Sequence, residues 1–188
     1  MGDTREVSNG LHLIYLGNVV AIIAALCMLL AILVPLLAVL IIFAVLIGGI
    51  ISLVGLARLR DLHGDYMIAL IATVVGIACG LLANNETFFG NLMNFVQSVC
   101  NLAQVYFVVR GTNSFLTERG FYAQVMMGDR AWKWQLICIA VSVAALLAII
   151  TVILLPLSVI LALVNLVVSI IALVFYLTYL KASAEALR

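Results

Sequence analysis

A stripe of uncharged polar side chains runs through residues 89–110, a stretch otherwise apolar enough to cross a bilayer. Its members step along the chain by three or four residues, so on a helix they occupy one face. Amides and hydroxyls donate and accept hydrogen bonds without carrying charge, which suits contact with a neutral polar group. This polar stripe consists of Asn91, Asn94, Gln97, Ser98, Asn101 and Gln104.

Two main interpretations of the polar stripe remain open. The stripe can line a route by which a neutral polar solute crosses the membrane. It can also hold a helical bundle together, because amides in lipid find hydrogen-bond partners only on other helices. Asn18 and Asn165 are single amides in two other apolar segments, and both interpretations make them partners of the stripe. A helix lying on the membrane surface would normally carry Lys or Arg on this face, and this face has none.

The densest group of ionisable side chains lies at residues 58–65, with the sequence RLRDLHGD. Two carboxylates flanking a histidine could hold a metal ion. The simpler interpretation is a helix end with basic residues in its last turn, followed by a solvated turn. We therefore predict no metal site, no cofactor, no catalytic residue and no enzymatic activity. The basic residues expected to contact lipid headgroups are Arg58, Arg60, Arg110, Arg130 and Lys133.

The composition is typical of a membrane protein. Apolar residues make up 67% of the 188 residues and charged residues only 9%, whereas soluble domains are about one quarter charged. Residues 19–51 and 136–180 are nearly continuous apolar tracts. A net charge of +1 argues against a nucleic-acid partner. All four cysteines lie in apolar segments, where free thiols pack as small apolar groups.

The two apolar tracts are too long for single spans. Residues 19–51 would extend about 50 Å as one helix, against a hydrocarbon core of about 30 Å. Pro35 is the only helix breaker in that tract, as Pro156 is in the other. We therefore expect an all-α, polytopic integral membrane protein with a single domain, residues 1–188, and six transmembrane helices arranged as three hairpins. A first hairpin that enters the membrane without crossing it is the alternative. The expected helices are residues 11–34, 36–58, 66–83, 89–110, 134–155 and 157–180.

Two features accompany this arrangement. Placing Pro35 on Pro156 pairs residues 11–60 with residues 132–181, and both segments end in a cation, which suggests a parallel hairpin repeat. Residues 111–133 mix aromatic and aliphatic side chains with charges, so we expect a cytoplasmic loop that carries a short interfacial helix.

Charge placement predicts the orientation. All nine Lys and Arg residues fall in segments that six helices place on the side of the two termini. The positive-inside rule then predicts a multi-pass protein of the cell membrane with both termini cytoplasmic. No ionisable residue lies near the middle of an expected helix, which disfavours proton-coupled transporters, pumps and voltage sensors.

Two functional hypotheses follow. In the first, the protein is a channel or transporter, or a subunit of one, and its polar stripe lines the route of a neutral polar solute. In the second, it is a structural or assembly protein of the membrane whose amides only join helices. The expected partners are the lipid bilayer and either a second copy in a homodimer or another membrane protein. Small residues four apart, such as Gly48 and Ser52, offer surfaces for close helix contact.

Overall fold

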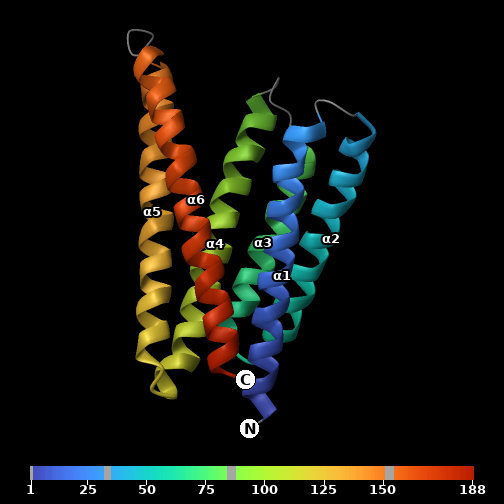
Figure 1. Ribbon diagram of the computed structural model, residues 1–188, viewed down its shortest axis with the longest axis vertical. Helices are drawn as coiled ribbons and strands as arrows, with labels where there is room; N and C mark the ends of the chain where they lie inside the picture. The colour runs from blue at the N-terminus through green and yellow to red at the C-terminus, as the bar shows by residue number, and fades with distance from the viewer. Residues whose placement is uncertain (1, 32–34, 84–87, 151–154) are drawn as a thin grey trace.

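The computed structural model describes residues 2–31, 35–83, 88–150 and 155–188, which form six α-helices and contain no strand. The all-α fold class predicted from the sequence is therefore confirmed. The helices run along the long axis of the molecule, and both chain termini lie at one end, here called the terminus end (Figure 1). The helices are α1 (Gly2–Ala31), α2 (Pro35–Leu59), α3 (Gly64–Leu82), α4 (Phe88–Glu118), α5 (Tyr122–Ile150) and α6 (Leu155–Ala186).

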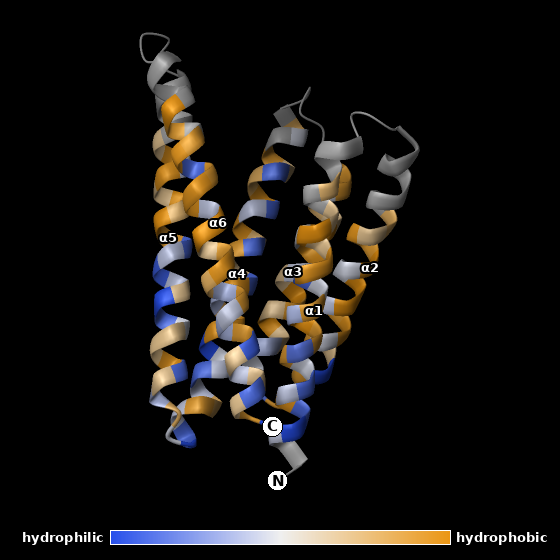
Figure 2. Cartoon of the chain, viewed as in Figure 1, coloured by the Kyte–Doolittle hydropathy of each residue, from blue (hydrophilic) through white to orange (hydrophobic). Residues whose placement is uncertain are grey.

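Apolar segments of membrane-spanning length occur in four of the described helices. They are Thr4–Ala24, Gly64–Leu82, Leu92–Glu118 and Leu163–Ala186, and α2 adds the shorter apolar segment Phe43–Leu59. This is the character of a multi-pass membrane protein, as the composition indicates. Hydrophilic residues gather toward the terminus end, and away from it the bundle is largely apolar apart from blue positions along α4 and on α5 (Figure 2).

The main contacts between helices close a ring. The tightest pairs are α1 with α2, α3 with α4, and α5 with α6. Looser contacts join α2 to α3, α4 to α5, and α6 back to α1, so the first and last helices lie side by side (Figure 1). A ring of this kind has an inner side, toward which one face of each helix turns.

The packed core fills this ring at the terminus end. Its residues step by three or four along the helices, as residues on one inward face must. Toward the other end of the described bundle, large apolar side chains such as Leu81 and Leu82 are exposed, at 80% and 61%. Among the residues whose burial the structure describes, the packed core therefore lies toward the terminus end. Its members come from all six helices and the last residues of the chain: Val7, Leu11, Ile14, Leu56, Leu59, Tyr66, Ala69, Val108, Val109, Leu116, Ala131, Tyr176, Tyr179, Leu180, Ala184 and Leu187.

The region between the fourth and fifth helices differs from the expected loop. Residues 111–118 continue α4 and residues 122–133 open α5, so no separate interfacial helix lies between them. The two helices meet at Gly120, whose φ of 78° lies in the left-handed region that favours glycine. Thr112 and Leu116 are fully buried, so tertiary packing extends the helix past the polar residues that suggested its end.

The small residues of α2 are used inside the chain. A Cβ on Gly48 would lie 2.7 Å from the carbonyl oxygen of Gly17 on α1, and Ser52 is also in contact with Gly17. Such close approach of two backbones is the usual role of small residues in membrane helices. Because Gly48 and Ser52 face α1, a homodimer would have to use another surface.

Candidate functional site

The polar stripe lies on α4, and one of its edges packs against α3. A Cβ on Gly80 of α3 would lie 2.7 Å from Nε2 of Gln97, and a Cβ on Gly76 would lie 3.1 Å from Cβ of Cys100. The α3 glycines therefore make room for α4, and Gln97 lies directly on the α3 backbone. At this edge the stripe acts as a helix–helix contact.

Another part of the stripe turns toward the inside of the ring. Val108, Thr112 and Leu116 are fully buried in the core and so identify the inner face of α4. Stepping back from Val108 by three or four residues continues the same face away from the terminus end. Steps of three or four also reach Gln104 and Gln97, so these glutamines lie on the same face, and Gln97 and Asn101 border α3 there. We call the following row of positions the inner line of α4: Asn94, Ser98, Asn101, Val105, Val108 and Thr112.

Exposure changes along this inner line. Val108 and Thr112 are fully buried, whereas Asn101 and Ser98 are exposed. Ser98 Oγ donates to the carbonyl oxygen of Asn94 at 2.9 Å, within the same helix. Asn94 and Gln104 are half-buried, and the side chain of Asn91 lies outside the described residues. The inner line thus carries exposed polar side chains at Ser98 and Asn101, further from the terminus end than its buried residues Val108 and Thr112.

On α1, Asn18 occupies a corresponding position. Val7, Leu11 and Ile14 are buried in the core, and Asn18 follows Ile14 by four residues on the same face. Its Nδ2 donates to the carbonyl oxygen of Ile14 at 2.8 Å, so the amide is held along its own helix. Two helices therefore carry an amide just beyond the core on their inner faces.

Asn165 has a different place, because it joins α6 to α5. Its Oδ1 accepts a hydrogen bond from Ser142 Oγ at 3.0 Å and lies 3.8 Å from Cys138 Sγ. Cys138 Sγ also shares a 3.1 Å contact with Ser169 Oγ. The structure thus brings Asn165 together with an α5 cluster and not with the polar stripe.

A layer of buried hydroxyl groups lies within the core, beside the inner line. The hydroxyls of Tyr66 on α3 and Thr112 on α4 share a hydrogen bond of 3.0 Å. The Tyr179 hydroxyl, from α6, donates to Asn113 Oδ1 at 2.8 Å, with the Val109 carbonyl oxygen at 3.2 Å. We call this group the tyrosine layer: Tyr66, Thr112, Asn113, Tyr176 and Tyr179.

Close packing fixes the tyrosine layer. A Cβ on Gly128 of α5 would lie 2.7 Å from Cε2 of the Tyr179 ring, so only glycine admits the ring there. Asn113 Nδ2 donates in turn to Asp129 Oδ1 at 3.1 Å, which extends the network to α5. The Tyr176 hydroxyl is buried and has no hydrogen-bond partner among the described residues. The layer therefore ties four helices together and leaves one buried hydroxyl, that of Tyr176, without a partner in the described part of the chain.

Sequence reasoning missed the tyrosine layer. The available signal was the placement of Tyr176 and Tyr179 three residues apart in an aliphatic helix, since a tyrosine buried among aliphatic residues needs a partner for its hydroxyl. That spacing puts both rings on one helix face but does not say which helix supplies the partner.

We expect Tyr179→Phe to lower the free energy of unfolding by about 1 kcal/mol, because Asn113 loses its buried donor. Thermal unfolding in detergent measures this effect. The matched control is Tyr122→Phe, which removes the same hydroxyl from a side chain that is 64% exposed. Equal stability of the two variants would show that the Tyr179 hydrogen bond contributes nothing.

The charged segment at residues 58–65 forms a helix cap and ion pairs. The Asp65 backbone N–H donates to His63 Nδ1 at 3.3 Å, so His63 caps the start of α3. Because that nitrogen accepts a hydrogen bond, the partner of the Asp65 carboxylate is Arg110, whose Nε lies at 3.4 Å. Asp61 lies 3.3 Å from the neighbouring Arg60 on the surface. Within the described ranges, no three His, Cys, Asp or Glu side chains are grouped as a metal site.

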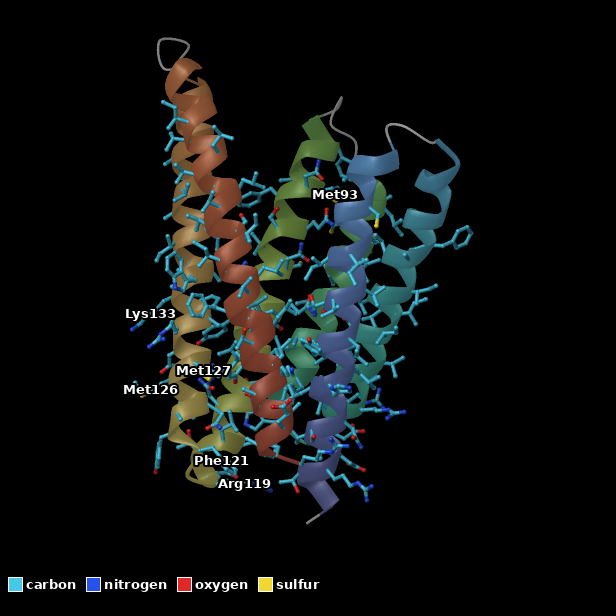
Figure 3. The ribbon with its side chains drawn as sticks, in the orientation of Figure 1. Met93, Arg119, Phe121, Met126, Met127 and Lys133 are labelled. Atoms are coloured by element: carbon cyan, nitrogen blue, oxygen red, sulfur yellow. The ribbon has the colours of Figure 1, made fainter. Side chains whose placement is uncertain are left out.

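The predicted headgroup cations are all exposed. Arg110 and Arg60 are held by carboxylates, as described above. Lys133 and Met126 project outward from α5 in Figure 3, away from the rest of the bundle.

Comparison of the chain with protein-family models, with curated proteins and with solved structures finds no match.

Proposed function

We propose that the protein is a channel or transporter subunit that passes a neutral polar solute along the inner line of α4. In this proposal all six helices span the cell membrane. Both termini are cytoplasmic, because the nine Lys and Arg residues belong to the segments at the terminus end. The solute meets the amides of the inner line within the bilayer and the tyrosine layer at the cytoplasmic side.

The exposure of Asn101 is the observation that carries this proposal. Asn101 lies within the apolar segment Leu92–Glu118 and on the face that turns into the core further along α4. Moving an amide from water into hydrocarbon without a hydrogen-bond partner costs about 2–7 kcal/mol. A side chain used only to join helices would be covered by its partner, whereas Asn101 is exposed although its Oδ1 borders Gly76 of α3. We take this exposed amide as a group that a solute can reach.

The chemistry of the inner line indicates the class of solute. Asn94, Ser98 and Asn101 provide donors and acceptors of hydrogen bonds and no formal charge, and Asn18 adds another amide on α1. An ion would need charged side chains or converging carbonyl groups to replace its hydration shell. A small uncharged molecule with hydroxyl or amide groups fits these side chains best.

The tyrosine layer supports a closed cytoplasmic end. Its hydrogen bonds join α3, α4, α5 and α6 within the core. Passage of a solute then requires these bonds to open. The buried Tyr176 hydroxyl, which has no described partner, offers one group that a passing solute or water can satisfy.

Solute flux into liposomes tests the proposal. Purified protein is reconstituted, and shrinkage and reswelling after a jump in glycerol, urea or erythritol concentration are followed by light scattering. We expect faster reswelling than in empty liposomes for at least one of these solutes, and no conductance for potassium or chloride. Folded protein that accelerates none of them would contradict the proposal.

The alternative function is assembly of membrane complexes without transport. The packing of Gln97 on Gly80 and the bonding of Asn165 to α5 favour it, because both amides join helices. In that case the exposed apolar side chains would contact a partner, which is either a second copy or another membrane protein. Absence of flux together with a stable complex of defined mass would support this alternative.

A further inference from the structure

A groove of about 150 Å³ lies between α1 and α6 at the terminus end. This is where the first and last helices meet and close the ring (Figure 1). One hydrogen bond crosses the helix pair beside the groove, from Ser8 Oγ to the Ala184 carbonyl oxygen at 2.6 Å. The groove lies at the ends of the apolar segments Thr4–Ala24 and Leu163–Ala186, where a membrane protein meets the headgroup layer.

The side chains of the groove suit a phosphate. Lys181 and Arg188 line it from the α6 side, and neither forms an ion pair with a described residue. Asn9 and His12 line it from α1, and the His12 ring stacks on Tyr15 with centroids 6.2 Å apart. Two unpaired cations and neutral donors from a second helix can hold phosphate oxygens from both sides.

One acidic side chain indicates which class of phosphate-bearing ligand fits the groove. Glu185 also lines the groove and likewise has no ion-pair partner among the described residues. Lys181 and Arg188 can contact a phosphodiester, while the Glu185 carboxylate adds a negative group, so the groove carries charges of both signs. The carboxylate opposes a doubly charged phosphate monoester and attracts an ammonium group next to the phosphate.

We propose that this groove binds the headgroup of an amine-bearing phospholipid. The phosphodiester contacts Lys181 and Arg188, and the ammonium group contacts Glu185. Asn9 and His12 contribute from α1, so the bound headgroup links the two helices whose contact closes the ring. This binding is independent of whether the bundle passes a solute.

Native mass spectrometry of the detergent-purified chain tests this site. The protein is titrated with dioleoyl phosphatidylethanolamine, dioleoyl phosphatidylglycerol, water-soluble glycerophosphoethanolamine and inorganic phosphate. We expect phosphatidylethanolamine to bind best and inorganic phosphate worst. Binding of inorganic phosphate equal to that of the lipids would show a general anion site and overturn the proposal.

Substitutions test whether this groove is where the lipid binds. The Lys181→Ala/Arg188→Ala variant should weaken binding of phosphatidylethanolamine at least about tenfold, because two charge-assisted contacts are lost. Arg5→Ala/Arg119→Ala, which removes the same charge from exposed residues that do not line the groove, should leave binding unchanged. Glu185→Gln should abolish the preference for phosphatidylethanolamine over phosphatidylglycerol. An equal loss in both double variants would show that the cations act only through net charge.

Thermal unfolding with and without lipid is a second measurement, which keeps the test valid if a substitution alters the fold. Because the headgroup links α1 to α6, added phosphatidylethanolamine should raise the midpoint of thermal unfolding of the native chain. The Lys181→Ala/Arg188→Ala variant should unfold near the midpoint of the lipid-free native chain and should not respond to the lipid. An equal lipid-induced rise in this variant would overturn the proposed site.

Discussion

Leucine in place of Gly48 should lower the unfolding midpoint of the protein by about 10 °C or prevent it from folding. The new Cβ alone would lie 2.7 Å from the Gly17 carbonyl oxygen, and a backbone atom cannot move aside as a flexible side chain can. Forcing α1 and α2 apart would cost about 3 kcal/mol, at the upper end of overpacking effects. Thermal unfolding followed by size-exclusion chromatography measures the loss.

The neighbouring glycine provides the control. A Cβ on Gly49 would have no atom within 4 Å, so Gly49→Leu should unfold near the midpoint of the native chain. Both variants add the same apolar side chain to the same turn of α2. A Gly48→Leu variant as stable as Gly49→Leu would show that the close contact of α1 with α2 does not hold the bundle together.

The second large effect is on transport. Asn101→Leu should lower the flux of the solute that the protein passes by about tenfold. The solute loses one or two hydrogen bonds, each worth about 1 kcal/mol, and about 1.4 kcal/mol corresponds to a factor of ten. Flux into liposomes at equal amounts of reconstituted protein measures this change. The unfolding midpoint should hardly change, because Asn101 is exposed and makes no described hydrogen bond.

Val99→Leu is the matched control for this variant. Val99 lies two residues away on α4 and is 48% exposed, but it belongs to the face opposite the polar stripe. We expect solute flux through the Val99→Leu variant to equal that through the native chain. A similar loss in both variants would mean that the amide has no special role in passage.

Much of the fold was predictable because it depends on local physics. Apolar tracts interrupted by Pro35 and Pro156 predict helices, and the described chain is all-helical. The extent of α4 was not predictable, since Thr112 and Leu116 stay helical through burial against other helices. Polar residues at such a position favour a helix end when judged alone.

The candidate site was predictable only in part. The spacing of the amides places them on one face of α4, but it does not say which neighbour covers which edge. The structure places Gln97 on Gly80 and Asn101 Oδ1 beside Gly76, yet leaves Asn101 exposed, an arrangement that depends on where α3 packs. The sequence also does not show that Gly48 packs against α1 inside the chain, because small-residue pairs look alike in sequence whether they join helices or whole subunits.

Accessibility of the inner line to water is the central claim, and cysteine labelling in liposomes tests it directly. Single cysteines replace Asn101, Ser98, Val99 or Leu92 in a variant whose native cysteines have been removed, and a charged, membrane-impermeant thiol reagent is added to both sides. We predict that Asn101→Cys and Ser98→Cys react at least about ten times faster than Val99→Cys and Leu92→Cys, because the thiolate forms only in contact with water. Equal and slow reaction at all four positions would contradict a route along α4. The native cysteines to be removed are Cys27, Cys79, Cys100 and Cys138.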